Sequence, residues 1–121
     1  MTAAELKTSL KKSGLRSTKD RCRILERFAE QRTWTVPELY QTLRSMDLST
    51  VYRNVQKLAD SGLLAVAHLH DRQPHYELTD RSHHAHLICE RCRTAECVPC
   101  PIDRLGTRHE LELKGLCSAC S

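Results

Sequence analysis

The fold of this chain is decided by the stretch STVYRNVQKLADSG at residues 49–62. Val51, Val55 and Leu58 recur at the spacing of one helix face, which predicts a helix that opens at Ser49 and buries these three side chains. Gly62 suits the left-handed residue that often ends a helix.

The first turn and outer face of this helix carry hydroxyls, an aromatic ring, an arginine and an amide: Ser49, Thr50, Tyr52, Arg53 and Gln56. An idle helix surface would carry a mixture of Glu and Lys instead. Hydrogen-bond donors on the exposed N-terminal turns are typical of a recognition helix in the major groove of DNA. A merely polar helix face is the alternative that this segment alone leaves open.

The segments on either side of this helix predict a winged helix-turn-helix over residues 1–79. We expect three helices before it: residues 3–12, a second capped by Ser17 or Thr18, and a third from a capping box at Thr35 and Glu38 to about Ser45. After it, residues 63–69 and 75–78 predict two strands joined by a turn at residues 71–74. Helices followed by a two-stranded hairpin are the order of elements in a winged helix-turn-helix.

A second unit is predicted over residues 80–121. We expect it to hold a strand at residues 84–89, a cysteine knuckle, a short helix near residues 102–107 and a strand at residues 110–116. The fold class of the chain is therefore predicted to be α+β.

Charge and composition favour a nucleic-acid partner. The net charge is +4 at pH 7 and the excess lies before residue 60, which suits a polyanion, although a solvated basic surface would look the same. The chain has neither an apolar run of about 18 residues nor a signal-peptide pattern, so we expect a cytoplasmic protein that does not bind a membrane. Aromatic residues make up only 4% of the chain. A metal or a partner subunit is therefore expected to support the small core.

Four cysteines predict a structural zinc. Cys89 and Cys92 form one Cys-x-x-Cys pair, and Cys117 and Cys120 form another. Thiolates hold Zn²⁺ tetrahedrally at about 2.3 Å, so two facing pairs supply a complete ligand set with no open position for a substrate. Disulfides are the alternative in a secreted chain, but the pairing pattern favours zinc.

A third pair, Cys97-Val-Pro-Cys100, leaves three alternatives open: one knuckle of the zinc site, a second metal, or a redox-active dithiol. Pro99 and Pro101 flank Cys100, so we expect a rigid loop, and we favour free or redox-labile thiols. Cys22 falls in the second predicted helix and is expected to be a small core residue.

Six of the seven histidines lie in the middle of the chain. His84 and His86 are two apart on the predicted strand, so both rings project from one face and can chelate one ion, while His83 points to the opposite face. On the hairpin, His75 and Glu77 share a face in the same way. Imidazole with carboxylate suits Zn²⁺, Fe²⁺ or Mn²⁺. A histidine-rich surface turn without a metal is the alternative.

Five motifs, in order, resemble the ferric uptake regulator family of metal-dependent repressors. They are GLRST at 14–18, STVYRN at 49–54, YELT at 76–79, HHAHLIC at 83–89 followed by Cys92, and GLCSAC at 115–120. The resemblance covers most of the chain. It implies a winged helix-turn-helix followed by a small α/β dimerisation domain, in a homodimeric repressor of metal-homeostasis genes that binds a palindromic operator in double-stranded DNA.

The resemblance also implies roles for single residues. Arg16 would enter the minor groove, while Tyr52 and Arg53 would contact bases and backbone in the major groove. The four paired cysteines would hold the structural zinc. The regulatory metal between the two units would be bound by Glu77, His84 and His86.

A further site in the dimerisation domain is implied by His83 and His109, with Glu96 or Asp103 as its acid. The interval between the two zinc-binding pairs is shorter than in typical relatives, which implies a truncated dimerisation helix. Ala85 also removes a carboxylate that the family often places between the histidines.

The regulatory site departs from the family pattern at Thr33, where relatives often supply a histidine. Its usual fourth ligand is therefore missing, and His68, His70 or His75 is a candidate replacement. The closing GLCSAC motif is most similar to that of zinc-uptake regulators, so Zn²⁺ is favoured over Fe²⁺ or Mn²⁺ as the regulatory ion. In the expected mechanism, a hinge near residues 79–82 lets the dimer sample splayed and closed arrangements, and the ion binds the closed one better.

Two other classes of protein compete with this interpretation. The tripeptide His75-Tyr-Glu77 matches half of the zinc deaminase signature, but no proline precedes Cys89 or Cys117, so we expect neither an enzyme nor a small organic substrate. A zinc-ribbon adaptor that binds only protein is the stronger alternative. The expected exposure of Tyr52 argues against it.

Overall fold

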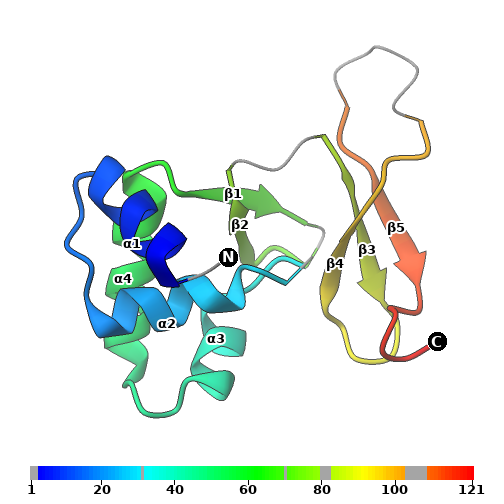
Figure 1. Cartoon of the computed structure of the whole chain (residues 1–121). Coiled ribbons are helices and arrows are strands. Elements are labelled where there is room, and N and C mark those ends of the chain that lie inside the picture. Colours follow the sequence, from blue (N-terminus) through cyan, green and yellow to red (C-terminus); the bar gives the residue numbers. More distant parts are fainter. Residues whose placement is uncertain (1–2, 31, 70, 80–82, 103–108) are drawn as a thin grey trace.

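The computed structural model describes residues 3–30, 32–69, 71–79, 83–102 and 109–121. In these ranges four helices come first: α1 (Ala3–Lys12), α2 (Lys19–Arg27), α3 (Val36–Thr42) and α4 (Leu48–Asp60). Five strands follow: β1 (Leu64–His68), β2 (Pro74–Leu78), β3 (Ala85–Cys89), β4 (Ala95–Val98) and β5 (Glu112–Gly115). The helices and the β1–β2 hairpin form one unit, and β3, β4 and β5 form a second unit beside it (Figure 1). The predicted α+β fold class is confirmed.

The helical unit is built around the apolar face of α4. Val51, Val55 and Leu58 are completely buried, as their spacing predicts. They belong to a core cluster whose other members come from the preceding segments and the hairpin: Leu6, Leu10, Ile24, Leu25, Phe28, Trp34, Leu39, Leu43, Met46, Leu64 and Tyr76. This burial fixes α4 against the hairpin and leaves its opposite face at the surface. None of the described helices is both long and apolar enough to cross a membrane.

Two helices begin at the caps expected from the sequence. The Thr18 hydroxyl accepts a hydrogen bond from the backbone N–H of Arg21 at 3.2 Å and starts α2. At α3, Thr35 and Glu38 form the complete capping box, with the N–H of Glu38 donating to Thr35 at 3.3 Å and the N–H of Thr35 donating to Glu38 at 2.9 Å.

The start of α4 differs from the prediction by one residue. The helix begins at Leu48 because Asp47 is its cap. The Asp47 carboxylate accepts hydrogen bonds from the backbone N–H of Thr50 at 2.8 Å and from the Ser49 hydroxyl at 3.1 Å. Ser49 therefore lies inside the first turn and supports the cap instead of forming it.

The end of α3 also differs from the prediction. The helix stops at Thr42 and does not reach Ser45, because Leu43 leaves the helical conformation with φ −117° and ψ 50°. The Leu43 side chain is still buried in the core. Its apolar spacing is satisfied by packing, although the backbone is no longer helical.

The second sheet has the strand order β4–β3–β5, with β3 antiparallel to β4 and parallel to β5. The rigid loop predicted around Cys97 is wrong, since residues 95–98 form β4 and Cys97 lies opposite His86. The prolines follow this strand and do not interrupt its pairing. The short helix expected near residues 102–107 falls mainly on residues that lie outside the described ones.

One short segment, residues 32–34, connects the two units. Trp34 pairs with Tyr76 of β2 through two backbone hydrogen bonds of 2.8 and 2.9 Å. The neighbouring N–H of Thr33 donates to the carbonyl of Ala95 in β4 at 2.8 Å. The β1–β2 hairpin (the wing hairpin) and the β4–β3–β5 sheet (the C-terminal sheet) are therefore both hydrogen-bonded to residues 32–34.

Candidate metal centres and nucleic-acid surface

Three groups of metal-ligating side chains lie among the described residues, and in each group the ligand atoms are within 4.8 Å of one another. The first, the four-cysteine cluster, consists of Cys89, Cys92, Cys117 and Cys120. The sulfurs of Cys92 and Cys117 are 3.7 Å apart. A tetrahedral ion with zinc–sulfur distances of about 2.3 Å requires sulfur–sulfur separations of about 3.8 Å, so the cluster has the dimensions of a structural zinc site.

The electrostatics of the four-cysteine cluster call for a cation. Backbone N–H groups of Cys92 and Cys117 point at the Cys89 sulfur and lower the pKa of that thiol to about 5. The sulfurs of Cys117 and Cys89 raise the pKa of Cys120 to about 12. In the metal-free cluster the thiolate forms of Cys89 and Cys92 are therefore favoured, whereas that of Cys120 is disfavoured. A divalent cation at its centre would stabilise all four.

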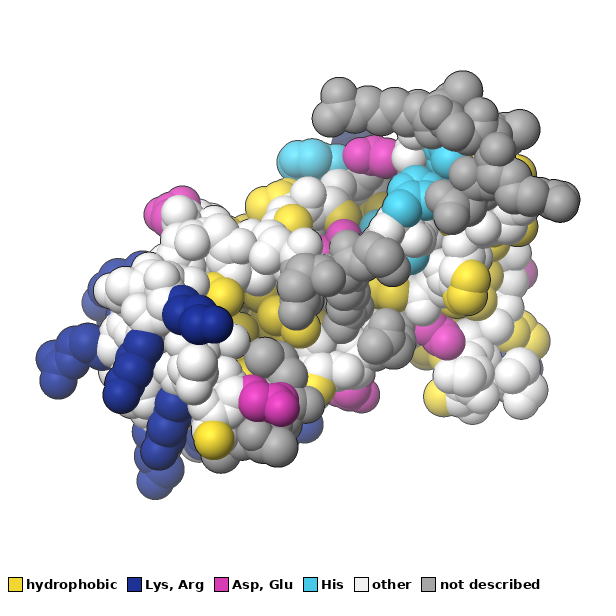
Figure 2. All heavy atoms as spheres, turned by 45° about the horizontal axis from the view of Figure 1, so that its top comes forward, with side chains coloured by type: hydrophobic (Ala, Val, Ile, Leu, Met, Phe, Trp, Pro, Cys, Tyr) yellow, Lys and Arg dark blue, Asp and Glu magenta, His cyan; other side chains and the backbone are white. Residues whose placement is uncertain are grey.

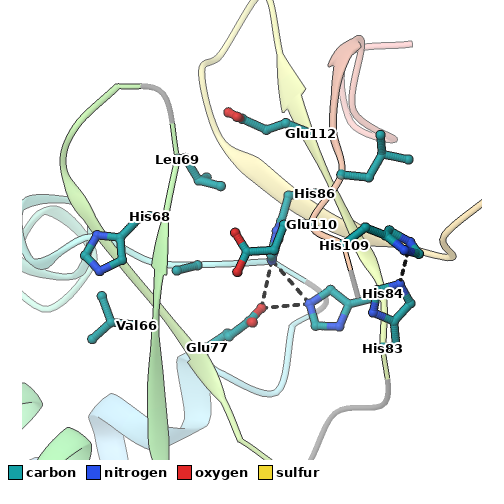
Figure 3. A pocket seen from close by; sticks show the side chains of 12 residues that line it. Val66, His68, Leu69, Glu77, His83, His84, His86, His109, Glu110 and Glu112 are labelled. Carbon is teal, nitrogen blue, oxygen red and sulfur yellow. Dashed lines mark hydrogen bonds and ion pairs between the residues drawn. The ribbon is translucent and has the colours of Figure 1, made fainter. Parts of the chain in front are cut away.

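The second group, the bridging cluster, consists of Glu77, His84, His86 and Cys97. One carboxylate oxygen of Glu77 lies 2.8 Å from Nε2 of His84 and 2.9 Å from Nε2 of His86. The two imidazole nitrogens are 3.2 Å apart, and the Cys97 sulfur is 3.6 Å from the same oxygen. Figure 3 shows Glu77 and the two rings converging from the hairpin and the sheet. The four donors of this cluster therefore come from both units.

The bridging cluster is largely shielded from solvent. The side chain of Glu77 is 14% exposed, and those of His84 and His86 are 16% and 14% exposed. Burial raises the pKa of the Glu77 carboxyl group, but the hydrogen bonds from His86 and His84 lower it by more, so that the pKa is about 2. The carboxylate is thus ionised at neutral pH. An ionised carboxylate, two imidazoles and a thiol are donors that suit a borderline divalent cation.

Cys97 is the member of the bridging cluster that the sequence prediction misses. It lies directly opposite His86 across the antiparallel pair β3–β4, and residues opposite one another project from the same face. A signal was present: once residues 95–98 are taken as a strand paired with β3, this register places the thiol beside the imidazole.

The third group, the His–Cys–His cluster, consists of His83, Cys100 and His109. The Nε2 atoms of the two histidines are 3.0 Å apart, and the Cys100 sulfur is 3.2 Å from Nε2 of His109. Of the two acids expected here, Glu96 instead accepts a hydrogen bond from the backbone of Ser118 at 3.1 Å. Asp103, the other candidate, lies outside the described residues. Among the residues that the structure describes, the donor that joins the two imidazoles is therefore a thiol.

The histidines expected to replace the ligand missing at Thr33 do not do so among the described residues. His75 is buried, and its ring nitrogens lie 2.9 Å from the Thr33 hydroxyl and 2.8 Å from the Asp71 carboxylate. His68 is exposed and lies apart from the converging rings (Figure 3). It lines the edge of a cavity of about 350 Å³ that Glu77, His84 and His86 also line. His70 lies outside the described residues.

The position of His75 also bears on the deaminase alternative. Its side chain belongs to a different hydrogen-bond network from Glu77, so the His-x-Glu tripeptide does not gather at one metal site. The part of the sequence that matched the deaminase signature therefore does not form one metal site in the structure.

The candidate nucleic-acid surface lies on α4. Tyr52 and Arg53 are exposed, as is Ser49, while Thr50 is half-buried. Gln56 is partly drawn inward, since its amide donates to the Tyr76 hydroxyl at 3.4 Å.

Arg16 lies in the turn between α1 and α2, where its side chain is exposed and its carbonyl accepts a hydrogen bond from Arg21 at 3.0 Å. Figure 2 shows lysine and arginine side chains gathered over the helical unit, with histidines at the opposite end. The basic side chains and the histidines thus occupy different ends of this face.

Comparison with known proteins gives a consistent result. The model of the ferric uptake regulator family matches residues 12–111. The ferric uptake regulation protein of Synechococcus elongatus is 31% identical over 98% of this chain and 95% of its own length. A solved structure of a zinc-bound manganese uptake regulator is 30% identical, with a TM-score of 0.77 over 97% of this chain and 99% of its own. The ferric uptake regulator of Vibrio cholerae is 27% identical, with a TM-score of 0.74 over 92% and 98%.

Proposed function

The chain belongs to the ferric uptake regulator family, and on this premise we propose that it is a metal-responsive, DNA-binding transcriptional repressor of metal-homeostasis genes. We place it in the cytoplasm as a homodimer whose partner is a palindromic operator in double-stranded DNA. The observation that carries the proposal is the bridging cluster, in which donors from the wing hairpin and from the C-terminal sheet meet at one point.

The chain's own residues suggest how metal and DNA binding are linked. Glu77 lies on β2, whose partner strand β1 packs against α4 in the helical unit, whereas His84, His86 and Cys97 belong to the C-terminal unit. An ion bound by all four fixes the orientation of α4 relative to the sheet. If the closed arrangement binds the ion better, the ion raises its population, and with it the affinity for DNA. The hinge expected near residues 79–82 falls mostly outside the described residues.

We propose Zn²⁺ as both the structural and the regulatory ion. The four-cysteine cluster offers only sulfur donors, which suit zinc. The bridging cluster adds a thiol to two imidazoles and a carboxylate, and this set favours Zn²⁺ over Mn²⁺, which prefers oxygen donors. Fe²⁺ is the second candidate, since it accepts imidazole and carboxylate. The solved structure of a zinc-bound manganese uptake regulator, a relative of this chain, supports zinc as an occupant of this fold.

The deciding experiment compares His86→Ala with His68→Ala. A DNA site is first selected from a random library with zinc-loaded wild-type protein, and its affinity is then measured with and without added zinc. We expect His86→Ala to lose the metal-dependent gain, on the order of 1–3 kcal/mol, while the zinc of the four-cysteine cluster and the dimer survive. His68→Ala removes an exposed imidazole at the same cavity and should respond as the wild type does.

Two outcomes would contradict the proposal. If His86→Ala and His84→Ala both keep the metal response, the regulatory site lies elsewhere. If zinc-loaded wild type selects no DNA sequence at all, the zinc-ribbon adaptor becomes the better interpretation, and a protein partner should be sought.

A further inference from the structure

The Cys97-Val98-Pro99-Cys100 segment contributes to two different metal-ligating clusters. Cys97 belongs to the bridging cluster and Cys100 to the His–Cys–His cluster. The thiol of Cys97 lies 3.6 Å from Glu77, and that of Cys100 lies 3.2 Å from His109. A Cys-x-x-Cys pair that binds a single ion would bring both sulfurs to one point, as in the four-cysteine cluster.

The two clusters share a second chain segment as well. His83 and His84 are adjacent in sequence, yet His83 meets His109 at 3.0 Å while His84 meets Glu77 at 2.8 Å. Each cluster therefore takes donors from the same two segments, residues 83–86 and 97–100. The remaining donor differs, Glu77 on the hairpin in one case and His109 before β5 in the other.

From this arrangement we propose that the Cys97–Cys100 segment divides its two thiolates between two ions and so couples their binding. The proposal builds on the proposed function, because the bridging cluster is the regulatory site. The ligand class is a thiophilic divalent cation, Zn²⁺ or Co²⁺, in preference to Mn²⁺. Each thiol loses its proton to solvent as the ion binds.

The coupling follows from shared backbone. An ion in the bridging cluster immobilises Cys97 and His84, and thereby positions Cys100 and His83 for the second ion. The second ion then binds to a site that has already lost part of its conformational entropy, and this gives positive cooperativity between the two ions. The bridging cluster should fill first, since the described residues give it four protein donors and give the His–Cys–His cluster three.

Cobalt titration tests the proposal without DNA, on dimeric full-length protein that carries zinc only in its four-cysteine cluster. Thiolate-to-cobalt charge transfer absorbs in the near ultraviolet and reports each sulfur ligand. We expect two equivalents of Co²⁺ to bind, each adding to this band, with excess Mn²⁺ unable to suppress it. Cys100→Ser should lose the second increment. Cys22→Ser alters a thiol of α2 that belongs to none of the three clusters, and it should bind as the wild type does.

Two further variants measure the coupling. His109→Gln should weaken Co²⁺ binding at the bridging cluster by roughly fivefold or more, and His84→Gln should weaken the His–Cys–His cluster by the same factor, because coupling is reciprocal. The intact zinc content of the four-cysteine cluster verifies folding in each variant.

A single equivalent of Co²⁺, or an unchanged band in Cys100→Ser, would overturn the division of the thiolates. The coupling would be overturned if two equivalents bind but neither variant affects the other cluster. In that case His109→Gln leaves the affinity of the bridging cluster unchanged, and His84→Gln leaves that of the His–Cys–His cluster unchanged. If the spectra behave as expected while DNA binding ignores metal, the proposed function fails and this inference stands.

Discussion

At the scale of single residues, Glu77 is already ionised in the bridging cluster before a metal binds. Two imidazole nitrogens contact one of its oxygens, at 2.8 and 2.9 Å, and the net effect lowers its pKa from 4.5 to about 2. The sign follows from linkage: the ionised carboxylate stabilises the metal-free fold above pH of about 4.5, and this contribution is lost as the pH falls towards about 2. Glu77 therefore has no proton to release when a metal binds near neutral pH.

The corresponding prediction concerns proton release. Wild type and Glu77→Gln should release the same number of protons on binding zinc at pH 8, where ordinary imidazole is neutral, although the variant binds more weakly. Calorimetry in buffers of different ionisation enthalpy measures this number. A variant that releases one proton fewer would show that Glu77 is protonated before the metal arrives. Cys97→Ser is the positive control, because it removes a thiol proton.

Thr33, the position at which the family resemblance predicts a histidine ligand, takes part in a buried hydrogen-bond network instead. Its hydroxyl is fully buried and pairs with Nδ1 of His75, whose other nitrogen pairs with Asp71 in the wing turn. The network connects the segment between the two units with the tip of the hairpin. None of the residues in this network belongs to the three clusters of metal-ligating residues.

Thr33→Val should therefore destabilise the fold without changing zinc content. The substitution keeps the shape of the side chain but leaves a buried imidazole nitrogen without its partner, at a cost of about 1–3 kcal/mol in the free energy of unfolding. Urea denaturation measures the loss. Thr8→Val, which removes an exposed hydroxyl bonded to Ala4, is the matched control and should cost less. Equal losses in both variants would mean that the buried network contributes nothing special.

At the scale of elements, α4 is positioned by the burial of one face and by the cap on its first turn. Asp47 fixes that turn, and the apolar face fixes the rotation of the helix. Together they leave Tyr52 and Arg53 at the surface with a defined direction. Both residues are therefore available to a DNA groove without any rearrangement of the core.

We expect Arg53→Ala and Tyr52→Ala each to weaken binding to the selected DNA site by about 1–3 kcal/mol, as for contacts that read bases. Asp60→Ala changes an exposed residue at the far end of the same helix and should have little effect. Gel shifts at fixed salt and saturating zinc provide the comparison. Equal affinities for all three variants would move the DNA-binding surface away from α4.

The elements also show what the sequence could and could not predict. The helices and their caps are local patterns, so α4 and the capping box at Thr35 were predictable to within one or two residues. Strand β4 was not, because it is short and the two prolines that follow it suggested a loop. Its pairing with β3 depends on contacts remote in sequence.

The candidate sites followed the same rule. Alternation along one strand placed His84 and His86 together, and a family pattern added Glu77. Cys97 and Cys100 required the register of a strand that was not predicted, so neither thiol was assigned to its cluster from the sequence. His75 was misassigned, since sequence does not reveal that a buried hydroxyl faces it.

At the scale of the whole molecule, the four-cysteine cluster ties the end of β3 to the end of the chain. The C-terminal sheet has only three short strands and little apolar core among the described residues. A structural zinc adds folding free energy directly in such a unit. Subunit association, which we assign to this unit, should therefore depend on it.

Cys89→Ser should accordingly lose one tightly bound zinc per chain and dissociate the dimer. Metal analysis together with light scattering measures both quantities on the same sample. Cys22→Ser is the matched control and should keep its zinc and its mass. A Cys89→Ser protein that stays dimeric with full zinc would show that this cluster does not bind a structural zinc on which the dimer depends.

The pairing of residues 32–34 with the hairpin and with β4 has a consequence for the order of events during synthesis. This segment leaves the ribosome long before Tyr76 and Ala95, so its backbone groups stay hydrated while the helices form local contacts. Closing these long loops comes late, since each closure costs chain entropy before it gains any contact. The two units are therefore expected to dock last, and the bridging cluster, whose donors come from both units, is assembled only in this final step of folding.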